Sequence, residues 1–326
     1  MHNEDNLKKK KFKLFDTQRE GKGVSREEAN LPPGFKKFFI LYKRDFFRLL
    51  SVNVLTILGN FPAIFLLLGI SGIFSLNFAT HSASAYTLFS GIMTQEGVTA
   101  PMLALNGIIG APVMDSVATV TTYVLIGIGA LTLFTFGIVN VGTTYVLRNM
   151  IKGDPVFVWS DFWYAVRRNL KQALIYGIFD LILIVLIPYN IVFYSQRTGF
   201  VNGLFFWLCI VVGFIYLMMR CYIYIQMLTF DLSIKKILKN SLIFAFIGFK
   251  RLIFAFLGCI LLILFTFMLA SVTSLLPLAI LVPIAMLFSN CAYMTTYAAY
   301  FKIKEVMIDP YDAKVAAAEN GDVATN

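Results

Sequence analysis

Residues 173–194 read ALIYGIFDLILIVLIPYNIVFY, an apolar run that contains a single charged residue, Asp180. A membrane-spanning helix needs about 20 consecutive, mostly apolar residues, so this run is long enough to cross a bilayer. Five further runs have similar length and composition, at 49–74, 119–141, 203–229, 252–270 and 275–300. The sequence therefore predicts an all-α polytopic membrane protein with six transmembrane helices and both termini on the same side.

Basic residues are concentrated in the connections on one side of the predicted membrane. Of the 28 Lys and Arg residues, 13 lie in residues 1–48, five between the second and third spans, five between the fourth and fifth, and three after the sixth. The opposite connections contain only Arg197, and the remaining basic residue, Arg220, lies inside the fourth span. Because basic residues mark cytoplasmic loops, the pattern predicts cytoplasmic termini.

The composition also argues against several classes of function. A net charge of +10 in a chain that is 58% hydrophobic is expected to face the anionic inner leaflet of the membrane rather than nucleic acid. The four Cys residues fall inside predicted spans and the two His residues outside them, without the spacing of a metal site. With no phosphate-binding Gly-rich loop, paired carboxylates within one span or nucleophile elbow, the sequence predicts a protein that is not an enzyme and uses no cofactor.

Changes in composition divide the chain into three parts. Residues 1–33 are predicted to be a disordered basic cytoplasmic tail, residues 34–304 the six-helix transmembrane domain, and residues 305–326 a second disordered cytoplasmic tail. Residues 75–115 form an insert on the outer side that contains no Lys or Arg. This insert is interpreted either as a surface loop at the lipid headgroups or as a docking surface for an extracellular or membrane partner.

Three cytoplasmic amphipathic helices are predicted, each directly before an outward-going span. The first begins at Phe35. The second has an apolar stripe of Trp159, Phe162, Trp163, Val166 and Leu170 opposite the basic residues Arg167, Arg168 and Lys171. The third has a stripe of Ile234, Ile237, Leu238 and Ser241 opposite Lys235, Lys236 and Lys239. We interpret the second helix either as lying on the anionic leaflet or as contacting a cytosolic subunit.

Polar side chains within the spans are costly in lipid, so Asp180 and Arg220 are the first candidates for a functional site. Their predicted depths are similar, and Asn60 and Asn290 fall at comparable depths, which suggests a polar layer in the inner half of the membrane. Three interpretations remain open at this point: a buried pair that fixes helix packing, a substrate or proton pathway, or an Arg220 side chain that extends towards the cytoplasmic surface.

Three sequence motifs carry a resemblance to a known family. Residues 143–149 read TTYVLRN, residues 157–162 FVWSDF and residues 168–172 RNLKQ, and Arg48 and Asn53 precede them. This pattern resembles the YesL-like integral membrane proteins of Gram-positive bacteria, a family of unknown function, over the entry to the first span and from the cytoplasmic loop into the third. The later spans match mainly in layout, and the insert at 75–115 departs from the shorter family pattern.

The resemblance implies a bacterial cell membrane location. Members of the family are commonly encoded beside ATP-binding-cassette importers for oligosaccharides. Together with the residues above, this predicts a non-enzymatic accessory or assembly subunit whose partners are the anionic inner leaflet and the permease or ATPase subunits of such an importer. The alternative is an independent transporter or channel for a small solute.

Overall fold

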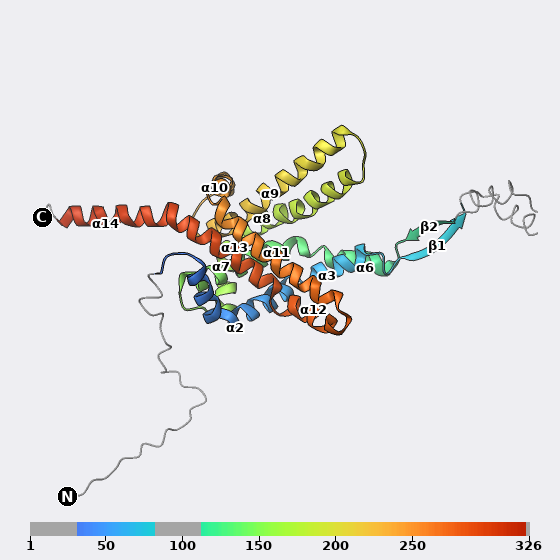
Figure 1. Cartoon of the computed structure of the whole chain (residues 1–326), viewed down its shortest axis with the longest axis horizontal. Helices are drawn as coiled ribbons and strands as arrows, with labels where there is room; N and C mark the ends of the chain where they lie inside the picture. Colours follow the sequence, from blue (N-terminus) through green and yellow to red (C-terminus); the bar gives the residue numbers. More distant parts are fainter. Residues whose placement is uncertain (1–30, 82–111, 324–326) are drawn as a thin grey trace, which may run out of the picture.

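The computed structural model describes residues 31–81 and 112–323 (Figure 1). These residues are almost entirely helical, in the order α2 (Phe35–Gly59), α3 (Pro62–Ile70), α6 (Val120–Gly129), α7 (Thr132–Lys152), α8 (Val158–Ser195), α9 (Phe200–Thr229), α10 (Ile234–Ile247), α11 (Phe249–Ser271), α12 (Leu276–Val282), α13 (Phe288–Ile303) and α14 (Asp309–Val323). Five helical segments are long and apolar enough to cross a membrane, or six if the bent pair α2–α3 is one span. The predicted all-α polytopic membrane fold is thus confirmed.

Two of the spans are discontinuous. Helix α2 ends at Gly59, and α3 begins at Pro62 at an angle of 55° to it, because a proline lacks the N–H that would continue the α2 helix. In the last span, a π-helical turn at Pro283–Leu287 lies between α12 and α13, and a second one at Lys304–Ile308 precedes α14. Such turns shift the helical hydrogen-bond register locally.

The three amphipathic segments join the spans that follow them in three different ways. Residues 35–48 are the first part of α2, which runs without a break into the first span. Residues 158–171 are the first part of α8, which bends at Asn169, where φ is −115° and ψ is 16°. Helix α10 is separate from the span that follows it, since it ends at Gly248 before α11 begins. The first segment is therefore continuous with its span, whereas the second meets its span at a bend and the third at a break.

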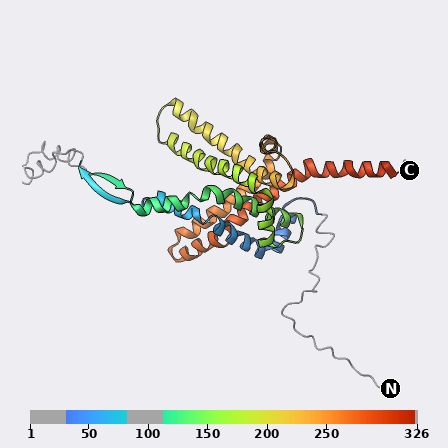
Figure 2. The ribbon, with the colours of Figure 1, turned by 180° about the vertical axis from the view of Figure 1, so that it is seen from behind.

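Buried residues concentrate at the end of the bundle where α2, α8, α10 and α11 begin, which we call the basic end. The main core there combines residues of α2, α7, α9, α11 and α13: Leu49, Leu147, Met150, Tyr222, Ile225, Leu252, Tyr293 and Ile303. Towards the other end the α8–α9 hairpin stands apart from α3 and α6, as Figure 2 also shows from behind. The side chains there are exposed and apolar, as expected for a surface in contact with lipid.

Helices α7 and α8 approach each other most closely at Gly137 and Gly177. A Cβ on Gly177 would lie 2.3 Å from the Gly137 Cα, and a Cβ on Gly137 would lie 2.0 Å from the Ala173 carbonyl oxygen. Neither position has room for a side chain. Small residues at such crossings let two backbones pack closely in a membrane, and here they position α8 against α7.

Two regions differ from what the sequence predicts. The insert at 75–115 contains an antiparallel ribbon, β1 (Leu76–His81) paired with β2 (Pro112–Val117), which extends beyond α3 and α6 in Figure 1. Residues 82–111 lie outside the described part of the chain, as do residues 1–30 of the tail predicted at 1–33. Residues 305–323, predicted to be disordered, instead continue as helix through α14. The Ala-rich stretch at 316–318 favours this helix.

Candidate functional site

The expected ion pair between Asp180 and Arg220 forms between helices α8 and α9. The Nε of Arg220 donates to both carboxylate oxygens of Asp180, each at 2.9 Å. The hydroxyls of Tyr216 and Tyr224 donate to the same carboxylate at 2.6 and 2.5 Å. These three donors are spaced four residues apart, so they share one face of α9 and point towards α8 together. Asp180 has no exposed surface.

Helix α7 completes this cluster. The Nη2 of Arg220 donates to Oδ1 of Asn140 at 3.0 Å, while Nδ2 of Asn140 donates to the carbonyl oxygen of Phe136 at 2.8 Å. The guanidinium carbon lies 5.5 Å from the centre of the Phe136 ring and 5.3 Å from that of Tyr224. We call Asn140, Asp180, Tyr216, Arg220 and Tyr224 the Asp180 cluster.

The Asp180 cluster joins three helices through a neutralised and well-bonded charge. Its carboxylate accepts four hydrogen bonds, and Arg220 is directed at Asp180 and Asn140 rather than extending towards the basic end. A buried charge is costly unless it is paired and hydrogen-bonded, and these contacts satisfy both conditions. Of the three interpretations left open by the sequence, this geometry favours the buried pair that fixes helix packing.

The other two members of the predicted polar layer occupy different places. Asn60 follows the last residue of α2, and its Nδ2 donates to the Thr56 carbonyl of the same helix at 3.1 Å. Asn290 is buried in α13, where it contacts the hydroxyl of Tyr42. Neither has a recorded hydrogen bond to Asp180 or Arg220 within the described part of the chain, so the predicted layer of four divides into separate sites.

A second polar centre lies at Asn53, which is fully buried in α2. Its Nδ2 donates to the carbonyl oxygens of Pro283 and Ile284 at 3.1 and 2.7 Å, and its Oδ1 accepts the Ser289 N–H at 2.8 Å. One carboxamide thereby bonds to the first two carbonyls of the π-helical turn in the last span and to an N–H two residues after that turn ends. Asn53 was singled out in the sequence only through the family resemblance.

A third centre, at the basic end, was not predicted. Asp45 is fully buried, and its carboxylate accepts hydrogen bonds from Arg44 Nη2 at 2.7 Å and from Arg48 Nη1 at 2.9 Å. The same Arg44 nitrogen donates to the Met150 carbonyl at 2.7 Å. Nearby, Arg148 Nη1 donates to a carbonyl in the last turn of α9 at 2.6 Å. The sequence signal that could have identified Asp45 is that it is an acidic residue within a basic amphipathic segment.

The predicted aromatic stripe of the second amphipathic helix is divided between the core and the surface. Phe162 and Val166 are buried in the core of the bundle. Trp159 and Trp163 are 63% and 47% exposed, and the basic residues Arg167, Arg168 and Lys171 are exposed beside them. Trp163, Tyr164, Arg167 and Arg168 line one surface recess. We call the exposed face formed by Trp159, Trp163, Arg167 and Arg168 the α8 surface.

Helix α10 shows the predicted two faces without such a division. Ile237 and Ser241 are buried, whereas Lys235, Lys236 and Lys239 are exposed. This lysine face lies at the basic end, as the α8 surface does, and carries only cationic residues. Within the described part of the chain, no group of three or more His, Cys, Asp or Glu side chains could hold a metal ion.

Comparison with known proteins adds no further assignment: no family model, curated protein or solved structure matches this chain. The class of protein therefore follows from the fold and the polar centres only: it is an all-α polytopic membrane protein with a hydrogen-bonded ion pair inside its spans.

Proposed function

We propose that this protein is a non-enzymatic accessory or assembly subunit of a membrane complex, with both termini in the cytoplasm of a bacterial cell. The observation that carries the proposal is the α8 surface, on which two tryptophans remain exposed while Phe162 and Val166 of the same segment are buried. Phe162 and Val166 attach the segment to the bundle, so the exposed tryptophans are not needed for that purpose.

The chemistry of the α8 surface suits a protein contact. Tryptophan, tyrosine and arginine are the residues that most often contribute strongly to binding at interfaces. Here Trp163, Tyr164, Arg167 and Arg168 surround one recess, and the Arg168 guanidinium is held by the Tyr164 hydroxyl at 3.3 Å. The bend at Asn169 separates this rigid, exposed segment from the membrane-spanning part of α8.

The partner we propose is the permease or ATPase of an ATP-binding-cassette importer for oligosaccharides. This choice follows from the resemblance of residues 143–172 to the YesL-like proteins. The inner-leaflet lipids would be a second contact, made by the lysine face of α10, because clustered cations near a membrane surface are attracted to anionic lipids.

The test is affinity purification of the full chain from its native membrane in mild detergent, with cells growing on an oligosaccharide. An importer permease or ATPase recovered in stoichiometric amount supports the proposal. The control is a known membrane complex purified in the same detergent, which must remain intact. If that complex survives and this chain still purifies alone, the proposal is contradicted.

The alternative function is an independent transporter or channel for a small solute. The specific observation in its favour is the pair of discontinuous spans, α2–α3 and α12–α13, which meet at Asn53, since transporters commonly bind substrates beside broken helices. Against it, the Asn53 carboxamide and the Asp180 carboxylate are each hydrogen-bonded to other groups of the protein rather than left free for a solute. Solute-dependent uptake into liposomes that contain only this protein would establish the alternative.

A further inference from the structure

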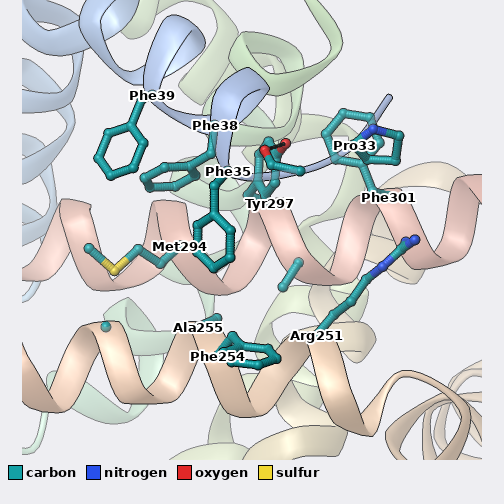
Figure 3. Close-up of a pocket in the computed structure, with 13 residues that line it drawn as sticks. Pro33, Phe35, Phe38, Phe39, Arg251, Phe254, Ala255, Met294, Tyr297 and Phe301 are labelled. Atoms are coloured by element: carbon teal, nitrogen blue, oxygen red, sulfur yellow. Dashed lines mark hydrogen bonds between the residues drawn. The ribbon is translucent and has the colours of Figure 1, made fainter. Parts of the chain in front are cut away.

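An aromatic groove runs along the side of the bundle at the basic end, between the start of α2, helix α11 and helix α13 (Figure 3). Its volume is about 310 Å³, and nearly all of its lining is apolar. Phe35 and Phe254 form its walls from opposite helices, with their ring centres 6.3 Å apart in an edge-to-face arrangement. Phe39 and Met294 lie at one end of the groove and Arg251 at the other, as Figure 3 shows.

Arg251 has hydrogen-bonding capacity left at the groove. Its Nη2 forms an ion pair with Glu305 at 2.8 Å, while its Nη1 is buried and has no hydrogen-bond partner among the described residues. A buried guanidinium nitrogen without a partner is unfavourable, because a charged donor loses its water without compensation. An anionic acceptor at this position would remove that cost.

A second recess continues from the first at Arg251. It is lined by Lys250, Arg251 and Lys302, together with residues of the α10–α11 connection. Glu305 bonds to Arg251 and Lys302 and is the acidic partner that both share. Three cations against one carboxylate leave this recess positively charged, whereas the adjoining groove is apolar. The two recesses therefore match a ligand with an anionic head and an apolar chain.

We propose that these adjoining recesses bind an anionic phospholipid, with its phosphate at Lys250, Arg251 and Lys302 and an acyl chain in the aromatic groove. The dimensions agree with this occupant. From Phe301 to Met294 the groove follows about 10 Å of α13, at 1.5 Å per residue. A flexible acyl chain can follow an apolar groove of this length, and the cationic recess at its end supplies the charge that a phosphate requires.

The test uses the full-length protein in phosphatidylcholine nanodiscs that contain a trace of phosphatidylglycerol with a photoactivatable group on its acyl chain. After illumination, the label should lie on peptides from the start of α2, α11 and α13. Unlabelled phosphatidylglycerol should abolish this labelling, and added phosphatidylcholine should not. Equal competition by phosphatidylcholine, labelling spread over the whole apolar surface, or a cross-linked dimer in place of a lipid adduct would each overturn the proposal.

Two variants separate the head from the chain. Arg251→Gln should lower labelling of the groove peptides at least fivefold. Lys152→Gln should leave it unchanged, because it removes a cation that is likewise paired with a carboxylate, Asp154 at 3.0 Å, but that lies outside both recesses. Gly258→Leu places a side chain in the groove against Met294, whose flexible sulfur would lie 2.9 Å from the new Cβ. It should also abolish groove labelling. If both variants elute as monodisperse protein and label like the unmodified chain, the proposed site is wrong.

Discussion

Asn53 in the first span and Ser289 in the last are joined by a hydrogen bond of 2.8 Å from the Ser289 N–H to the Asn53 side-chain oxygen. The nitrogen of the same carboxamide donates to the main-chain carbonyls of Pro283 and Ile284, the first two residues of the π-helical turn. The side-chain amide thus supplies main-chain groups of this irregular region with the hydrogen-bond partners that peptide groups supply within a regular helix. Residues 236 positions apart in the sequence are held together at the place where the last span is irregular.

Replacing Asn53 with leucine should destabilise the fold, because it keeps the side-chain size while leaving three main-chain groups without partners. The expected loss is about 1–3 kcal/mol in the free energy of unfolding. Asn190→Leu is the matched control, since the Asn190 amide bonds only to the Leu186 carbonyl of its own helix. Thermal unfolding in detergent should show a clear loss for the first variant and little for the second. Equal melting temperatures would contradict the assigned role.

How far the sequence predicts this architecture depends on the type of signal. Apolar length and the distribution of basic residues predict the spans, because both follow from the bilayer itself. The Asp180–Arg220 pair was also predictable, because unpaired charges are rare in lipid. Tyr216 and Tyr224 could also have been predicted as members of this site, since their four-residue spacing on either side of Arg220 places all three side chains on one helix face.

Other features follow from tertiary contacts that no local pattern carries. The partners of Asn53 lie at Pro283, Ile284 and Ser289, so its role requires knowing which helices adjoin. The burial of Phe162 beside exposed Trp163 likewise depends on α7 lying against one side of the segment. The β1–β2 ribbon pairs strands on the two sides of residues 82–111, and neither strand has a strong alternating pattern of its own.

The Asp180–Arg220 pair should behave as a coupled unit in a double-mutant cycle. Asp180→Asn leaves the Arg220 charge without its counterion, and Arg220→Gln leaves the Asp180 charge buried alone, so each should cost about 3–5 kcal/mol. The double variant should be less destabilised than the sum of the two, because neither charge remains. Unfolding in detergent measures all four states. Strictly additive losses would show that the two side chains do not stabilise each other.

The crossing of α7 and α8 should be sensitive to a single methyl group. Gly177→Ala places a Cβ against the Gly137 backbone, where only a shift of a whole helix can relieve the overlap, and should cost about 1–3 kcal/mol. Gly127→Ala is the control, because a Cβ there meets nothing within 4 Å and alanine favours the helix by about 1 kcal/mol. A Gly177→Ala variant as stable as Gly127→Ala would contradict the close crossing.

The orientation expected from the basic residues can be tested at two exposed positions. Arg197 lies in the α8–α9 connection, and Lys235 lies on α10 at the opposite end of the bundle. A membrane-impermeant maleimide should label Arg197→Cys in intact cells and Lys235→Cys only after the membrane is opened. The unmodified chain, with its four native cysteines, gives the background to subtract. The reverse labelling pattern would invert the topology.

The last prediction concerns the α8 surface. If Trp159 and Trp163 only anchor the segment in lipid, leucine should replace them well, because binding to a bilayer surface follows buried apolar area rather than shape. A protein interface instead concentrates its binding energy in a few aromatic residues, so the change of both to leucine should weaken the complex by about 2 kcal/mol or more. The measurement is recovery of the importer permease or ATPase at matched membrane levels of the chain.

Trp207→Leu supplies the control for this measurement. Trp207 is 64% exposed, as Trp159 is at 63%, but it lies in the half of α9 away from the basic end, where the surface is apolar and suited to lipid. Its replacement should leave partner recovery unchanged. Because all three tryptophans are exposed and lie outside the buried core, both variants should fold and reach the membrane normally. Equal recovery from the double variant, Trp207→Leu and the unmodified chain would exclude the α8 surface as the docking site.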